Sequence, residues 1–73
     1  MQIWVKTLIG TKVDFNVDED ATALHLKQLL EEKQGIQVDQ IRLIYKGKQL
    51  NDEDKLVDKQ VTAGAVVHMV LQL

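Results

Sequence analysis

Few side chains in this 73-residue chain could act as nucleophiles, because it contains no cysteine and no serine. Covalent catalysis would therefore depend on its threonines, which are Thr7, Thr11, Thr22 and Thr62. All of them fall in predicted turns or at a predicted helix start, where threonine has a structural role. We therefore predict a protein that is not an enzyme, with a small enzyme as the alternative from another class.

Residues that could bind a metal ion or a cofactor are also few. His25 and His68 lie on a predicted helix and a predicted strand and share no ligand motif. The acidic loop 52–54 does not open a calcium loop, since the sixth and twelfth positions hold Val57 and Ala63 instead of Gly and Glu. The glycines are scattered and form no phosphate-binding loop. We expect no metal and no cofactor.

Composition narrows the class of protein. A net charge of -2 argues against a nucleic-acid binder, and 45% hydrophobic with 27% charged residues is typical of a globular domain. No apolar run is long enough to cross a membrane, and the N-terminus reads as a strand rather than a leader. Absence of cysteine fits a reducing compartment. We expect one domain over residues 1–73, monomeric, in the cytoplasm and nucleus.

The elements that would position any site follow from periodicity. Alternating apolar residues predict strands over 1–7, 12–17, 40–45, 48–50 and 66–73, with a tight turn at Lys46-Gly47. A helix is predicted to begin at Ala23 with Thr22 as its N-cap and to stop at Gly35. Its apolar stripe is Ala23, Leu26 and Leu30, and Leu24 falls off the stripe and should be partly exposed. The pattern predicts an α+β domain with one helix on one sheet.

The alternation of the strands places some apolar residues on the sheet face that should be exposed to solvent. If Ile41 and Leu43 enter the core, Ile44 points outward, and so do His68 and Val70 on the last strand. With Leu8 at a hairpin tip, these would form an apolar cluster, with a basic rim if the strands are neighbours: Lys6, Arg42 and Lys48. Such a cluster is typical of a partner-binding site, although isolated outward Ile and Val residues are also common in strands.

Trp4 is a second outward apolar residue, between Gln2 and Lys6. It is either a smaller contact site or a side chain partly buried by a neighbouring loop.

Five stretches of the chain closely resemble the ubiquitin family in register and without gaps: 1–8, 35–36, 39–45, 47–50 and 68–71. The resemblance implies the β-grasp fold, a mixed five-strand sheet packed on one helix with its first and last strands parallel. It also implies a protein modifier that acts as a recognition signal.

The resemblance assigns residues to sites. The family's receptor-binding patch matches Leu8, Ile44, His68 and Val70, flanked by Arg42 and Lys48. A secondary patch matches Ile36, Leu71 and Leu73, and candidate acceptor lysines for isopeptide bonds are Lys6, Lys27, Lys33 and Lys48. The implied partners are ubiquitin-receptor helices or domains, activating and conjugating enzymes, cullins and the proteasome.

Departures from the family pattern leave the pathway open. Thr11, Leu29 and Ala63 stand where ubiquitin has acceptor lysines. Several stretches are closer to the family's neddylation modifier, which is attached to cullins. Gln72 replaces the ubiquitin Arg and the neddylation modifier's Ala at a position that activating enzymes read.

The sequence ends at Leu73, before the Arg-Gly-Gly tail through which the family is conjugated. We expect either a modifier trimmed of this tail or a non-conjugating ubiquitin-like domain of a larger protein, such as a proteasome shuttle. The residues that follow Leu73 in the parent gene would decide between them.

Overall fold

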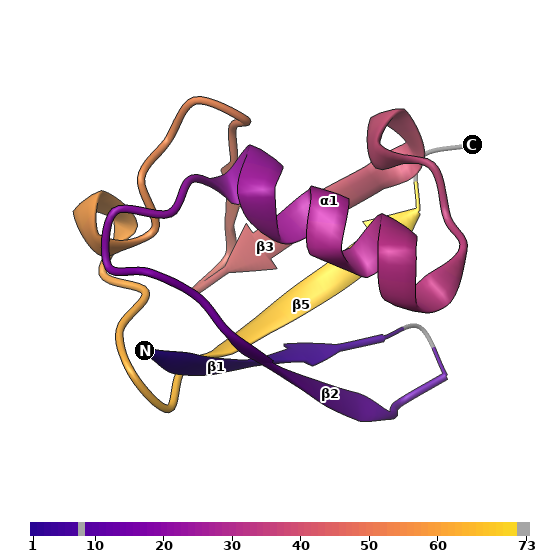
Figure 1. The fold of residues 1–73 in the computed structure, drawn as a ribbon, viewed down its shortest axis with the longest axis horizontal. Coiled ribbons are helices and arrows are strands. Elements are labelled where there is room, and N and C mark those ends of the chain that lie inside the picture. The colour runs from indigo at the N-terminus through magenta and orange to yellow at the C-terminus, as the bar shows by residue number, and fades with distance from the viewer. Residues whose placement is uncertain (8, 72–73) are drawn as a thin grey trace.

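A computed structural model describes residues 1–7 and 9–71 of the chain. Its helix α1 lies across one face of a five-stranded sheet (Figure 1). The strands are β1 (Gln2–Lys6), β2 (Lys12–Asn16), β3 (Ile41–Tyr45), β4 (Lys48–Leu50) and β5 (Val66–Leu71). The helices are α1 (Ala23–Gln34) and two short 3₁₀ turns, η1 (Val38–Gln40) and η2 (Val57–Lys59).

The sheet has the order β2-β1-β5-β3-β4, so the last strand lies at its centre. β1 and β5 are parallel, and the other neighbouring strands are antiparallel. This mixed arrangement, with the first and last strands as the parallel pair, is the one that the resemblance implies.

The ends of α1 follow from its capping residues. The Thr22 hydroxyl accepts a hydrogen bond from the His25 amide at 3.3 Å, which satisfies one of the free N–H groups of the first turn. Gly35 has a φ of 72°, in the left-handed region, and its N–H donates to the Glu31 carbonyl at 2.9 Å. The predicted start at Ala23 and stop at Gly35 are both confirmed.

The core lies between α1 and the inner face of the sheet. Ala23, Leu26 and Leu30 of the helix are fully buried, and Leu24 is half-buried, as the stripe predicts. The fully buried side chains from the strands and from the segment that follows β4 are Ile3, Val5, Ile41, Leu43, Leu50, Leu56, Val61 and Val67. Burial of these inner positions leaves the alternate strand residues on the opposite face of the sheet.

A two-residue turn joins β3 to β4. Lys46 and Gly47 have φ angles of 53° and 80°, so both occupy the left-handed region that a type I′ hairpin turn requires. The turn sets the register of the hairpin by placing Tyr45 opposite Lys48.

Lys46 is an unfavourable residue for this turn, because a side chain with a Cβ atom is strained at positive φ and Asn tolerates that conformation best. We expect Lys46→Asn to raise the free energy of unfolding by about 0.5 to 1 kcal/mol. Urea denaturation would measure the change. Lys48→Asn, on the adjoining strand, is the matched control and should not be stabilising; equal stabilisation by both would contradict the explanation.

Candidate partner-binding surface

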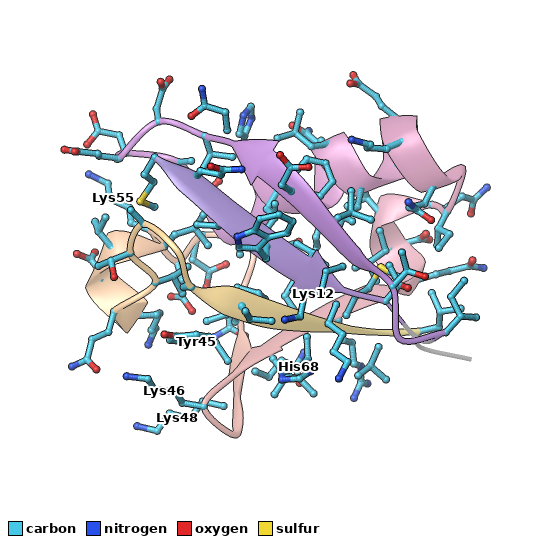
Figure 2. The ribbon with its side chains drawn as sticks, turned by 90° about the horizontal axis from the view of Figure 1, so that it is seen from below. Lys12, Tyr45, Lys46, Lys48, Lys55 and His68 are labelled. Atoms are coloured by element: carbon cyan, nitrogen blue, oxygen red, sulfur yellow. The ribbon has the colours of Figure 1, made fainter. Side chains whose placement is uncertain are left out.

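The outer face of the sheet carries the residues that strand parity singled out. β3 and β5 are antiparallel neighbours, and their register sets Ile44 opposite His68 and Arg42 opposite Val70. Ile44 and Val70 are half-buried, and His68 is exposed. Directly opposite residues on one sheet face have Cβ atoms about 5 Å apart, so these side chains form one surface. Figure 2 views this side of the sheet and shows His68 on it, with α1 behind the strands.

Basic residues extend this surface across the sheet. Lys6 on β1 lies opposite His68, and Lys12 on β2 lies opposite Lys6. Both lysines are exposed. Lys6 was identified from the sequence as part of the rim but Lys12 was not, because β2 has no outward apolar residue that points to a binding surface.

Lys48 occupies a different place from the one predicted. It lies opposite Tyr45, and Gln49 lies opposite Ile44, so Gln49 and not Lys48 continues the outer surface at this edge. Lys48 instead lines a hollow of about 240 Å³ between the β3–β4 hairpin and η2, together with Tyr45, Lys46, Leu50 and residues 58–60. Figure 2 shows Lys46 and Lys48 together at the hairpin tip. The physical reason is the two-residue turn, which fixes the register and gives Lys48 the parity of the buried Leu50.

Trp4 is half-buried on the outer face, opposite Asp14 of β2 and Val66 of β5. The Asp14 carboxylate accepts a hydrogen bond from the Gln2 side-chain amide at 3.0 Å. The structure therefore places Trp4 on the same face as His68, nearer the start of β5.

The secondary patch lies elsewhere, on the helix side of the sheet. Ile36 and Leu71 are half-buried and line one hollow of about 210 Å³ with Met69 and Ile9. Ile9 is 88% exposed, the most exposed large apolar residue among the described positions. The family resemblance did not identify Ile9, although its place in an exposed hairpin loop was a signal.

The candidate acceptor lysines differ in accessibility. Lys6, Lys33 and Lys48 are exposed, and the Lys33 ammonium lies 5.4 Å from the centre of the Phe15 ring. Lys27 is 7% exposed, and its Nζ lies 2.6 Å from Oδ1 of Asp52. Its amine is therefore less accessible than those of the other three lysines, which argues against Lys27 as an acceptor in the folded chain.

Three residues of the predicted sites lie outside the described part of the chain: Leu8, Gln72 and Leu73. Within residues 1–7 and 9–71, no helix is both long and apolar enough to cross a membrane. Over the same residues, no group of three or more His, Cys, Asp or Glu side chains is placed to hold a metal ion.

A mixed five-stranded sheet packed on one helix, with parallel first and last strands, is the β-grasp fold. The ubiquitin family model matches residues 3–73. The chain belongs to the ubiquitin family.

The relatives narrow the class further. The chain is 41% identical over 73 residues to the NEDD8-like protein RUB1 of Saccharomyces cerevisiae. The alignment covers 100% of this chain and 95% of that protein. It is 38% identical to the ubiquitin-like protein NEDD8 of Dictyostelium discoideum, over 100% of this chain and 95% of that protein. It is also 36% identical to ubiquitin-like protein 4A of Xenopus tropicalis, over 99% of this chain but 49% of that protein. The first two similarities support a ubiquitin-like modifier.

Proposed function

We propose that this chain is a NEDD8-type modifier that receptors recognise through an apolar patch on the outer face of the sheet. The patch comprises Ile44, His68 and Val70, with Leu8 added from the resemblance. The modifier acts as a recognition signal and not as a catalyst.

The register of β3 and β5 is the observation that carries this proposal. It brings Ile44 beside His68, and it brings Val70 beside Arg42. Half-buried apolar side chains surrounded by polar and basic ones are typical of the centre and rim of a protein interface. On a helix-free sheet face, this patch can accept a receptor helix or a small domain.

The NEDD8-like relatives favour the neddylation pathway over the ubiquitin pathway. This chain aligns with 95% of the length of each of these two relatives, so the likeness is not confined to one domain of a longer protein. We infer that the partners include activating and conjugating enzymes of that pathway and cullins as targets. We also infer that Lys6, Lys33 and Lys48 are its accessible acceptor lysines.

Ile44→Ala tests the patch. Truncating an apolar anchor at the centre of an interface costs about 2 kcal/mol, so we expect affinity for a ubiquitin-receptor helix to fall about 30-fold. Titration of a fluorescently labelled receptor helix with each variant would measure the dissociation constant.

Val57→Ala is the matched control, because Val57 is also an outward apolar residue, 37% exposed, but belongs to η2 and not to the patch. It should leave the affinity unchanged. Unchanged affinity of Ile44→Ala, in a variant whose circular dichroism matches the parent, would refute the patch.

A second function is favoured by the likeness to ubiquitin-like protein 4A, of which this chain spans about half. In that case the chain would be the ubiquitin-like domain of a longer protein, using the same patch without being conjugated. Sequencing the parent transcript beyond Leu73 separates the two: Gly-Gly at the end of the open reading frame supports the modifier, and a long continuation supports the domain.

A further inference from the structure

The hollow between the β3–β4 hairpin and η2 is built from strained backbone. Among residues 1–7 and 9–71, the residues other than glycine with a positive φ are Lys46, at 53°, and Gln60, at 66°. Both of them line this hollow of about 240 Å³. A side chain at positive φ costs free energy, and residues in such conformations are concentrated at ligand sites. The strain therefore directs attention to what the hollow could hold.

Three lysines line the hollow from its two sides. Lys46 and Lys48 belong to the hairpin, and Lys59 belongs to η2. Tyr45 also lines the hollow, and the Lys46 ammonium lies 5.4 Å from the centre of the Tyr45 ring. This cation–π contact holds the Lys46 ammonium at the wall of the hollow. Figure 2 shows Tyr45, Lys46 and Lys48 together at one end of the hairpin.

Carboxylates of the protein neutralise these lysines only in part. In the part of the chain that the structure describes, no carboxylate lies within 4.0 Å of the ammonium of Lys46 or Lys48. Lys59 Nζ has one such neighbour, Oδ2 of Asp54, at 4.0 Å. Of the described residues that line the hollow, only Asp58 is acidic. Three lysines and one aspartate leave two positive charges at the hollow, although the chain carries a net charge of -2.

We propose that this hollow binds a diphosphate group, either as free pyrophosphate or as part of a nucleoside diphosphate. Phosphate oxygens accept hydrogen bonds from ammonium groups, and lysine is a common phosphate ligand. A cavity of about 150 Å³ holds benzene, so the hollow has room for more than a single phosphate. A diphosphate carries charged oxygens at both ends, which suits a hollow with lysines on both sides. The site is independent of the proposed patch, because Ile44, His68 and Val70 do not line it.

Titration of the isotope-labelled chain with pyrophosphate, followed by amide chemical shifts, tests this site. We expect saturable shifts that are largest at residues 45–48 and 58–60, which include most of the lining. Sulfate at the same ionic strength is the control for a general salt effect, and it should bind more weakly.

Charge substitutions within the hollow should change the dissociation constant in opposite directions. An exposed charge pair contributes about 0.2 to 1 kcal/mol, so Lys59→Gln should weaken binding about two- to five-fold. Asp58→Asn removes a repelling carboxylate and should strengthen binding by a similar factor. Lys12→Gln is the matched control, because Lys12 is an exposed lysine on β2, at the opposite edge of the sheet from β4. It should leave the dissociation constant unchanged, as expected of a distant charge that salt screens.

Lys46→Asn separates binding from folding. This variant is expected to be more stable than the parent, because Asn suits the turn, yet it lacks one of the three ammonium groups. We expect it to bind pyrophosphate about two- to five-fold more weakly. Weaker binding by a more stable variant cannot result from a loss of folded protein.

ADP distinguishes the two sources of the diphosphate. Tighter binding of ADP than of pyrophosphate, with shifts of the Tyr45 ring signals, would support a nucleotide whose base contacts that ring. Equal or weaker binding of ADP would support free pyrophosphate. Three results would each overturn the site: no saturable shifts, equal affinity for sulfate, or an equal response of the Lys12 and Lys59 variants. None of these would affect the patch, whose test depends on Ile44.

Discussion

Replacing Leu26 with alanine is expected to lower the free energy of unfolding by about 3 kcal/mol, the largest effect we expect from a single substitution. Leu26 is 0% exposed on the inner stripe of α1 and belongs to the core between helix and sheet. Its truncation removes buried apolar surface and leaves a cavity that the surrounding strands can fill only in part. A domain of this size has a total stability of roughly 4 to 11 kcal/mol, so the loss is a large share of it.

Leu24→Ala is the matched control on the same helix. Leu24 is half-buried and off the stripe, so the same change of side chain should cost about 1 kcal/mol or less. Urea denaturation followed by circular dichroism would measure both variants. Similar losses at Leu24 and Leu26 would contradict the claim that the helix contributes through one buried stripe.

The fold was predictable from the sequence to the extent that local signals determine it. The caps of α1 at Thr22 and Gly35 act within one helical turn, and the alternation of Ile3 and Val5 determines which strand face is buried. These signals depend on neighbours in the sequence, so no knowledge of the tertiary structure is needed to recognise them.

The candidate site was less predictable, because its residues meet only through the pairing of strands. The alternation of each strand predicts that Ile44 and His68 point outward. Only the register of β3 and β5 shows that they lie opposite each other. Lys12 was missed because the outward positions of β2 hold only Lys12, Asp14 and Asn16, and no apolar residue among them points to a binding surface. The place of Lys48, by contrast, follows from a two-residue turn at Lys46 and Gly47 and could have been found by counting across the hairpin.

The burial of Lys27 could have been predicted from the sequence, although the family resemblance says nothing of it. Ala23, Leu26, Lys27 and Leu30 occupy the positions i, i+3, i+4 and i+7 of one helix face. That spacing places Lys27 on the buried stripe, and the structure shows it buried there.

The second large effect is expected where Lys27 meets Asp52. The ammonium group belongs to a side chain that is 9% exposed, whereas the Asp52 side chain is 51% exposed. Asp52→Ala would leave a buried cation without its partner, and we expect it to lower the free energy of unfolding by about 2 to 3 kcal/mol. This is less than the full cost of a stranded charge, because the open side towards Asp52 gives water partial access.

Lys27→Met should behave differently, because it removes the buried charge, keeps most of the apolar stem and leaves Asp52 in contact with water. We expect a change within about 1 kcal/mol. The double variant should then be more stable than Asp52→Ala alone, since no charge remains stranded, and thermal denaturation of all four proteins would give the coupling between the two residues. Equal stability of Asp52→Ala and the double variant would show that the ammonium group is adequately solvated. The 2.6 Å ion pair would then be no barrier to modification of Lys27, and the exclusion of this lysine as an acceptor would fall.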